Sequence, residues 1–421
     1  MGFQAGLSGL NASSKGLDVI GNNIANANTY GMKASRAEFS ELVSSAIGVS
    51  GGDNAGIGVT VGAVSQQFSQ GTLNITGNNL DAAINGNGFF QLQEADGSAG
   101  YTRAGNFKLD KNGYIVTNNG AKVLGYQTNP TTGKPLSTSP TPLTLPTSGS
   151  IAAKATADDT STSPTTYGAT AKFNLPANAT VDTTLTAADP LLGQYSTTFN
   201  AYDSLGNTVP VSVYFQKTAT AGTWNVYTKT DTGAITAATP ATLKFTASGA
   251  LDTTVAGNGQ IAISGPATPA DGANQVQFTL DLTGTTQFAS AFATNNVAQT
   301  GYADGKLTGV KIGADGTLTA SYSNGTTQSA GQLALASFRN NQGLMQVNGG
   351  DWKETFASGP PTQGTPGSGN FGALQAGALE ESNVDLTQEL VNMMTAQRSY
   401  QANAQTIKTE DQIMNTLVNL R

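Results

Sequence analysis

The two ends of this 421-residue chain carry heptad repeats, whereas the residues between them alternate as β-strands do. The apolar positions of each repeat form a narrow seam along one face of a helix. A helix cannot bury such a seam by itself, so we expect the two ends to pair with each other and with copies of the chain. The seam residues are Phe3, Leu7, Leu10, Leu17, Ile20 and Ile24 at the N-terminus, and Leu386, Leu390, Met393, Tyr400, Ile407, Met414 and Val418 at the C-terminus.

Polar side chains interrupt or flank this seam. Asn22, Asn23 and Asn26 either stay solvated or form hydrogen bonds between subunits. Gln397 and Asp411 occupy seam positions, where they either set the register of the pairing or mark its wet edge. An ordinary amphipathic helix, packed on the protein's own core, is the alternative interpretation for both ends.

Composition excludes several classes of function. Charged residues make up 11% of the chain, and 20 basic against 27 acidic residues leave a net charge of −7. Because Lys and Arg do not cluster with aromatic residues, we expect no nucleic-acid partner. The absence of Cys and His excludes disulfides, zinc sites built from these residues and a histidine general base. We also expect neither a membrane span nor a cleaved signal peptide, since the apolar stretches are too short.

Proline marks the middle of the chain, because none of the 15 prolines lies in 1–129 or 367–421. We predict a mixed α and β fold in which the terminal helices pair as a coiled coil and the middle domains are mainly antiparallel β. Pairing of the ends makes the domain plan nested and the domains discontinuous. The expected parts are a terminal coiled-coil domain (1–28 plus 382–421), a connecting segment (29–70 plus 358–381), an inner β domain (71–144 plus 286–357) and an inserted outer β domain (145–285).

Local signals set the expected elements near the N-terminus. The first helix should end near Asn26 and Gly31, residue types that tolerate the left-handed conformation of a helix C-terminal cap. A short helical stretch is expected around Glu38–Ala46. The alternating apolar residues over 59–68 predict a strand.

Turn and cap residues set the elements further along. Asn112-Gly113 predicts a tight turn between two strands. A second turn over 202–207 leads into a strand of alternating valines. Ser382 with Asp385 three residues later predicts a capping box that opens the last helix.

Several stretches resemble chemical sites, and we interpret each one structurally. Asp110–Gly113 and Asp315-Gly316 lack the ligand number and the distant Glu of a calcium loop, so we predict turns. Gly86–Gly88 lacks the Gly-Lys-Ser/Thr of a phosphate cradle. Glu380-Glu381 precedes a predicted helix, where negative charge complements the helix dipole. We therefore expect no catalytic residues, no cofactor and no metal site.

Extended motifs resemble the rod-and-hook family of bacterial flagellar axial proteins. The N-terminal match alone does not distinguish rod from hook members, whereas the later stretches favour the hook branch. The resemblance covers roughly 1–127 and 285–421. The matching stretches are SGLNAS (8–13), LDVIGNNIANANTYGMK (17–33), LDAAINGNGFF (80–90), YTRAGNFKLD (101–110), GNFG (369–372), GALEESNVDL (377–386) and LVNMMTAQRSY (390–400).

The resemblance implies a subunit of the curved, hollow tube that joins the rod to the flagellar filament. Paired terminal helices would line this homopolymer, and β domains would form its outer shells. The implied partners are the distal rod, the hook cap, the hook-filament junction protein, the hook-length control protein and the type III export machinery. Export by that machinery places the protein outside the cell, in the flagellum, without a cleaved signal peptide.

Two other functions stay open at this point. A distal rod protein of the same family would be shorter and would lack the insertion, and a secreted β-rich adhesin finds support only in the Thr/Ser-rich centre. A carbohydrate-processing enzyme ranks last. For the leading interpretation, we expect the terminal segments to be largely disordered in the monomer and to fold on assembly, because a lone glycine-rich helix is unstable in water.

Overall fold

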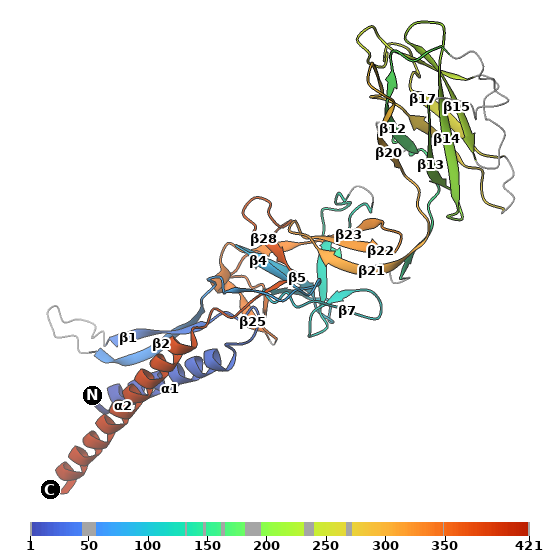
Figure 1. The fold of residues 1–421 in the computed structure, drawn as a ribbon. Helices are drawn as coiled ribbons and strands as arrows, with labels where there is room; N and C mark the ends of the chain where they lie inside the picture. The colour runs from blue at the N-terminus through green and yellow to red at the C-terminus, as the bar shows by residue number, and fades with distance from the viewer. Residues whose placement is uncertain are drawn as a thin grey trace. The chain divides into compact units, whose positions relative to one another are not determined.

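The computed structural model has one helix at each end of the chain, and the residues between them are mainly antiparallel β; the two helices lie together (Figure 1). The chain forms two compact units, and the second unit lies within the first along the sequence. The first comprises Met1–Thr147, Gly309–Ser321 and Thr327–Arg421, and the second comprises Ser148–Thr308 and Tyr322–Thr326. The described residues are 2–43, 56–130, 133–145, 149–160, 165–181, 195–230, 240–266, 272–347 and 349–419.

Helix α1 (Gly2–Ala25) ends where the sequence predicted a cap. The backbone N–H and the side-chain Nδ2 of Asn26 both donate to Asn22 O. Further along, Gly31 adopts φ +71°. Gly31 lies six residues beyond the end of α1, so its left-handed conformation turns the chain that follows, and Asn26 ends the helix without adopting that conformation. The predicted helix end is therefore confirmed.

Helix α2 (Leu386–Asn419) opens differently from the prediction. Asp385 itself is the cap, since its Oδ1 accepts hydrogen bonds from the backbone N–H groups of Thr387 (2.8 Å) and Gln388 (3.2 Å). Ser382 Oγ accepts instead from Val384 N, at 3.3 Å. The predicted Ser382–Asp385 box is wrong because the helix begins three residues later, where the carboxylate satisfies its free N–H groups.

The segment after α1 is a long β-hairpin, so the predicted helical stretch at Glu38–Ala46 is wrong over its described part. Strand β1 (Ser35–Val43) pairs antiparallel with β2 (Gly56–Gln66), from Ser35↔Gln66 onward. Residues 44–46 lie outside the described residues. Helix propensity is a weak preference, and the antiparallel ladder to β2 stabilises β1 as a strand. The strand predicted over 59–68 corresponds to β2.

The β part of the first unit is built around one antiparallel sheet with the order β22-β23-β9-β5-β6-β26-β25. Its core contains Phe90, Leu92, Val123, Leu333 and Leu335, all without exposed surface. The strands are β5 (Phe89–Gln93), β6 (Ala99–Thr102), β9 (Lys122–Tyr126), β22 (Thr317–Tyr322), β23 (Thr327–Leu333), β25 (Met345–Val347) and β26 (Asp351–Lys353), with β21 (Gly305–Ile312), β10 (Thr141–Pro142), β24 (Leu335–Ser337) and β27 (Thr362–Gly364) beside them.

The predicted turn at Asn112-Gly113 is confirmed. It joins β7 (Lys108–Leu109) to β8 (Ile115–Val116), with Gly113 at φ +81°. Asp110 Oδ1 accepts from the backbone N–H groups of Asn112 and Tyr114, both at 2.8 Å, so this carboxylate stabilises the turn.

Two short antiparallel strand pairs bring the C-terminal segment of the first unit beside its N-terminal segment. β28 (Ala373–Ala376) pairs with β4 (Ala82–Asn85), and β29 (Ala378–Glu380) pairs with β3 (Leu73–Ile75). The last strand before α2 therefore lies among the segments that follow α1.

The second unit is a β-sandwich whose core includes Trp224, Phe173, Phe215 and Leu280. One sheet has the order β13-β14-β15-β16; in the other, β12 pairs with β18 and β19 in parallel and with β20 antiparallel. The unit extends past the expected boundary at 285 because β19 and β20 pair with β12. The strands are β11 (Ser150–Ile151), β12 (Ala169–Pro176), β13 (Tyr195–Tyr202), β14 (Thr208–Lys217), β15 (Thr223–Thr230), β16 (Ala241–Lys244), β17 (Gln260–Ser264), β18 (Gln277–Asp281), β19 (Thr286–Phe288) and β20 (Ala293–Gln299).

Candidate assembly interface and helix junction

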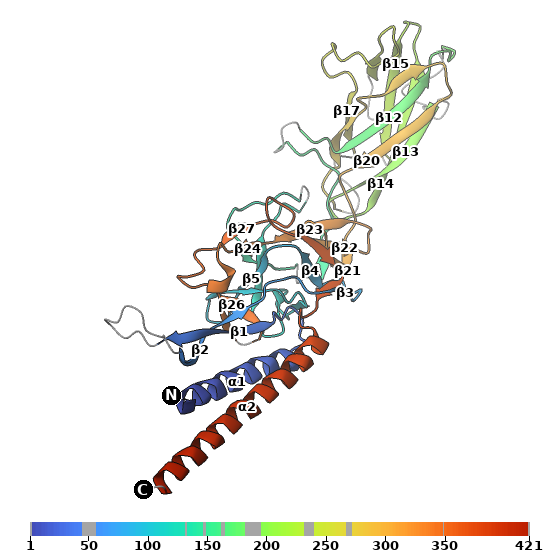
Figure 2. The same ribbon diagram turned by 90° about the vertical axis from the view of Figure 1, so that its left-hand side faces the viewer.

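Helices α1 and α2 lie side by side and run antiparallel, as both ribbon views show (Figures 1 and 2). Small residues of α1 allow the two helices to come close to each other. A Cβ at Gly6 would lie 3.1 Å from Cγ1 of Ile407, and a Cβ at Gly9 would lie 2.8 Å from Nδ2 of Asn403. Asn403 Nδ2 donates to Ser13 Oγ at 3.4 Å. The two helices thus meet through glycine and polar side chains of α1.

Much of the predicted apolar seam lies outside this contact. Ser8 Oγ accepts from Val59 N at 3.2 Å, so hairpin strand β2 covers part of α1. Leu10, Leu17, Ile20, Ile24, Met393 and Ile407 are partly buried, and the side chain of Val418 lies outside the described residues. The remaining seam residues are 37–60% exposed: Phe3, Leu7, Leu386, Leu390, Tyr400 and Met414.

A hollow of about 470 Å³ separates the middle parts of the two helices beneath the hairpin. Gly16 and Ile20 of α1, Phe39 and Val59 of the hairpin, and Ala396 of α2 line it. The helices are therefore not packed along their whole length in a single chain.

The polar residues that the sequence analysis placed beside or on the seam lie in different environments. Asn23 is buried, and its side chain pairs with both backbone groups of Ser35: Nδ2 donates to Ser35 O (2.8 Å), and Oδ1 accepts from Ser35 N (2.9 Å). Its Nδ2 also donates to Glu389 Oε1 of α2 at 3.2 Å. Asn23 is thus neither solvated nor placed for a neighbouring subunit, because the hairpin uses its amide. Asn22 and Gln397 are exposed, and Asn26 caps α1.

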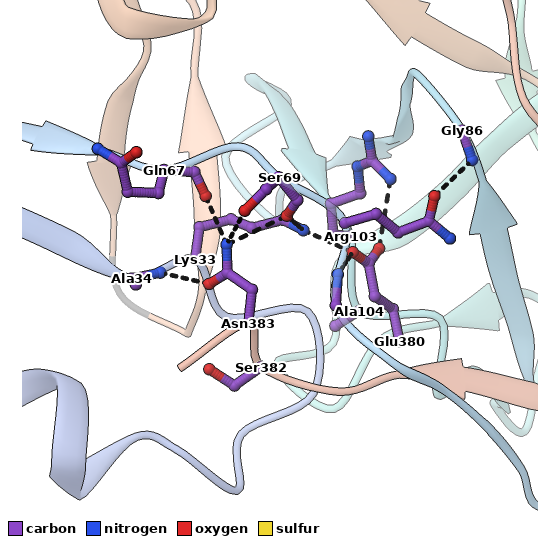
Figure 3. Close-up of polar contacts among 12 residues, drawn as sticks. Lys33, Ala34, Gln67, Ser69, Gly86, Arg103, Ala104, Glu380, Ser382 and Asn383 are labelled. Carbon is purple, nitrogen blue, oxygen red and sulfur yellow. Dashed lines mark hydrogen bonds and ion pairs between the residues drawn. The ribbon is translucent and has the colours of Figure 1, made fainter. Parts of the chain in front are cut away.

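The strongest polar cluster joins the segments that enter and leave the helices (Figure 3). Lys33 follows the end of α1, and its Nζ lies 2.5 Å from Glu380 Oε1 and donates to Ser69 O at 2.8 Å. Arg103 Nη1 lies 3.3 Å from Glu380 Oε2. All three charged side chains are buried. One carboxylate therefore holds two cations from different segments, a group that we call the junction triad (Lys33, Arg103, Glu380).

Backbone groups complete the junction. Glu380 O accepts from Gly31 N at 2.8 Å, and Glu380 Oε1 accepts from Gly71 N at 3.0 Å. Asn383 Oδ1 accepts from Ala34 N at 2.7 Å, while its Nδ2 donates to Gln67 O, also at 2.7 Å. The chain after α1, the chain after β2 and the chain before α2 are thereby fixed to one another.

Burial sets the electrostatics of the triad. Loss of hydration lowers the pKa of Lys33, and the adjacent carboxylate of Glu380 opposes this shift. Burial likewise lowers the pKa of Arg103 against the same carboxylate. The guanidinium of Arg103 also lies over the ring of Phe89, at 5.2 Å from its centroid. Removing Glu380 would leave two buried cations without their counter-charge, and removing either cation would leave the carboxylate with one partner where it had two, which is destabilising.

Sequence reasoning missed this junction and misplaced Glu380. The prediction that Glu380 complements a helix dipole is wrong, since Glu380 ends strand β29 and bonds to Lys33 and Arg103. Glu381, the second member of that pair, accepts from Asn74 Nδ2 at 3.0 Å. The only signal was the occurrence of all three charged residues inside the quoted motifs, and pairing of residues this distant cannot be read from spacing.

The described residues contain no group of three or more acidic side chains placed to hold a metal ion. No helix among them is long and apolar enough to cross a membrane. Terminal helices that leave apolar side chains exposed, and a buried junction that joins them to the β part of the first unit, are typical of a structural subunit of an assembly.

Family comparisons agree with this class. The model of the flagella basal body rod protein matches residues 3–33, and the flagellar basal body rod FlgEFG C-terminal model matches 375–420. Between them, the flagellar hook protein FlgE/F/G D1 domain matches 83–181, and the flagellar basal body protein FlaE D2 domain matches 174–302.

Full-length relatives identify the family. The chain is 42% identical to the flagellar hook protein FlgE of Escherichia coli and 43% identical to that of Salmonella typhimurium, with 100% of each chain covered. The hook protein FlgE of Rhizobium meliloti is 33% identical, over 100% of this chain and 98% of the relative. The chain belongs to the flagellar hook protein family, a structural family of the bacterial flagellum.

A solved structure supports the fold. The crystal structure of Helicobacter pylori flagellar hook protein FlgE2 aligns with a TM-score of 0.51 at 13% identity, covering 72% of this chain and 98% of that one. Two terminal helices and mainly antiparallel β domains are thus consistent with the fold of this family.

Proposed function

We propose that the chain assembles with copies of itself into the curved, hollow flagellar hook, the flexible joint that transmits torque from rod to filament. The observation that carries the proposal is the exposure of the apolar seam on α1 and α2. Phe3, Leu7 and Leu390 are about half exposed in a single chain, and apolar helix faces of this kind require a partner.

The seam then belongs to a helical layer that several subunits share. Within one chain, Gly6 and Gly9 of α1 meet Ile407 and Asn403 of α2, so most of the apolar seam takes no part in this contact. The residues that could stabilise a coiled coil are those left exposed beside this contact. In this proposal, helices from neighbouring copies cover them, and the terminal segments become fully ordered on assembly.

In the proposed tube, each part of the chain forms a different layer. The terminal helices form the inner layer, the β part of the first unit forms the middle shell, and the second unit forms an outer domain. A fixed inner layer with outer surfaces that slide would let the tube bend under torque. The low charge of the chain, 11%, favours weak hydrogen bonds that re-form easily at these surfaces.

The partners follow from the family. The subunit would contact the distal rod at one end of the tube, the hook cap during growth, and the hook-filament junction protein at the other end. Export through the type III machinery, with the hook-length control protein acting on it, would place the tube outside the cell.

Assembly and helix content of the purified chain test the proposal together. We expect short curved tubes in negative-stain images at high protein concentration, and a rise in helical circular dichroism as tubes form. Straight rods would favour a distal rod protein. A chain that stays monomeric with fully helical ends would overturn the proposal.

A further inference from the structure

A polar hollow of about 280 Å³ lies in the first unit, beside the pair of strands β6 and β26. Every residue that lines this hollow, except Ala104 and Gly349, carries an oxygen atom in its side chain. Asp351 supplies the one carboxylate of the lining, and neither Lys nor Arg contributes to it. The hollow therefore offers one negative charge and several neutral oxygens to a ligand.

Asp351 is buried, and no cation among the described residues is placed to neutralise it. Only 3% of this residue is exposed. Burial raises the pKa of Asp351, and the carboxylate of Glu94 acts in the same direction. Lys353, two residues further along strand β26, donates instead to Ser98 Oγ at 2.8 Å, and both cations of the junction triad are bonded to Glu380. An ionised carboxylate in such surroundings is costly unless a cation compensates it.

Hydrogen bonds hold the carboxylate of Asp351 in place and leave part of its accepting capacity free. Asn119 Nδ2 donates to Asp351 Oδ2 at 3.2 Å, and the side chain of Thr102 donates a second hydrogen bond. An ionised carboxylate has about four lone-pair sites, so two donors do not exhaust it. Gly349 makes room for this arrangement, since a Cβ there would collide with Nδ2 of Asn119. The carboxylate is thus oriented without being neutralised.

Thr117, a second buried residue of the lining, has a hydroxyl group that forms no hydrogen bond within the described residues. Thr117 is 8% exposed, and its Oγ1 is buried. Its backbone N–H donates to Ala121 O at 2.9 Å, which fixes the turn that carries Asn118 and Asn119. Buried hydroxyls are nearly always hydrogen-bonded. A buried hydroxyl without a partner, in the same lining as a buried carboxylate, points to a ligand from outside the chain.

The chemistry and size of the hollow select the kind of ligand. Hard cations such as Ca²⁺ bind carboxylate and amide oxygens together with water molecules. Softer metals prefer imidazole or thiolate ligands, and the chain has neither His nor Cys. A water molecule occupies about 30 Å³ in the liquid, so a hollow of about 280 Å³ has room for a cation and several of its waters.

We propose that this hollow binds a hard cation of the calcium class, with Asp351 as the charged ligand and Thr117 Oγ1 as a neutral one. Asparagine side chains of the rim, Asn28 and Asn118, complete the site with water. The cation would join the chain that follows α1 to strand β26, and so would stiffen the β part of the first unit beside the terminal helices. With a single carboxylate, we expect weak binding, in the range of about 10⁻⁴–10⁻³ M that extracellular modules show.

Sequence reasoning expected no metal site because the acidic residues do not cluster along the chain. The ligands proposed here come from three distant segments, around Asn28, Thr117 and Asp351, which only the fold brings together. All of them belong to one chain, so the inference does not depend on assembly. Its failure would leave the proposed function untouched.

Luminescence of Tb³⁺, which occupies calcium sites, tests the proposal directly. Tyr30 lines the hollow, so its excitation should sensitise a bound Tb³⁺. We expect the monomeric wild type to give this emission, Ca²⁺ to suppress it, and Asp351→Asn to raise the half-saturating concentration by at least about tenfold. Asp18→Asn, at a carboxylate that is 65% exposed, is the matched control and should bind as the wild type does. Equal binding by the two variants would overturn the inference.

The stability of the first unit gives a second readout, which does not rely on Asp351→Asn folding normally. Ca²⁺ should raise the urea midpoint of the wild type, followed by the fluorescence of Trp352 in a Trp224→Phe background, because it binds only the folded state. Thr117→Val removes the unpartnered hydroxyl, so it should fold as stably without the cation and lose most of the Ca²⁺ shift. A wild type that Ca²⁺ does not stabilise, an equal shift in Thr117→Val, or an equal shift with NaCl at matched ionic strength would each overturn the assignment.

Discussion

Lys33 Nζ lies 2.5 Å from Glu380 Oε1, although 347 residues separate the two along the chain. The contact closes a loop of sequence that contains the whole second unit and the β part of the first. Because both side chains are buried, it fixes the chain leaving α1 to the chain entering α2 at one point. The junction is therefore one of the links between the terminal helices and the β part of the first unit, beside the hairpin, whose Gln66 accepts from Trp352 Nε1.

Lys33→Met should destabilise the first unit by about 3–5 kcal/mol, because the buried carboxylate of Glu380 would lose its closest cation and Ser69 O its donor. Unfolding in urea can be followed by the fluorescence of Trp352, with Trp224→Phe as the background. These are the only 2 tryptophans, and one lies in each unit.

Lys15→Met is the matched control for this prediction, since Lys15 is about two-thirds exposed and its pair with Asp18 lies on the surface. Exposed pairs contribute about 0–1 kcal/mol. If Lys33→Met costs no more than Lys15→Met, the junction triad does not stabilise the first unit.

Gly31→Ala should be more disruptive than Gly77→Ala, although both glycines have positive φ angles, +71° and +73°. A Cβ at Gly31 would lie 2.5 Å from the backbone nitrogen of Ala104, whereas a Cβ at Gly77 meets nothing within 4 Å. The shared backbone strain is about 1–2 kcal/mol, and the clash adds about 1–3 kcal/mol at Gly31 alone. Equal urea midpoints for the two variants would show that the junction can shift to admit a side chain.

The elements that the sequence predicted are those whose signals are local. The Asn112-Gly113 turn and the end of α1 depend on residues within a few positions of one another. Strand β1 was missed because interactions outside it hold it in place. It pairs with β2, and the side chain of Asn23 bonds to the backbone of Ser35, and neither interaction can be read from the sequence of 38–46. The junction triad was missed for the same reason, since it joins residues from three distant segments.

The predicted seam shows a different limit of reasoning from sequence. Heptad spacing predicted an apolar seam on each helix, but where α1 meets α2 the structure brings only Ile407 of that seam against Gly6, while Gly9 faces Asn403. A periodicity of apolar residues cannot reveal where small residues allow two backbones to approach. Whether the seam is the interface between subunits stays a prediction.

Leu7→Ser should leave the monomer folded and weaken assembly, since Leu7 is 43% exposed in a single chain. Loss of the apolar contact should raise the tube-forming concentration by about tenfold. Sedimentation of tubes measures this threshold, and Trp352 fluorescence checks the β fold. Gln4→Ser, an exposed polar position on the same helix, should have no effect. A seam that served only its own chain would lower helix content in the monomer and leave the threshold unchanged.

The contribution of Asp351 to the free energy of unfolding of the first unit should increase as the pH falls. The contribution is measured as the difference between the wild type and an Asp351→Asn variant. Burial raises the pKa of Asp351 above its ordinary 3.8, even though Thr102 and Asn119 donate hydrogen bonds to it. The folded state then binds the proton more tightly than the unfolded state, so this contribution is full below about pH 3.8 and is lost as the pH rises through the folded pKa.

The free energy of unfolding, measured for both proteins from neutral pH downward, isolates this group because all other carboxyls are common to the pair. The difference between wild type and Asp351→Asn should shift in favour of the wild type on acidification. A difference that is constant with pH, or that shifts in favour of the variant, would mean that the buried carboxylate has a counter-charge. The polar hollow of about 280 Å³ beside Asp351, which Asn106, Asn118 and Tyr30 line, offers none among the described residues.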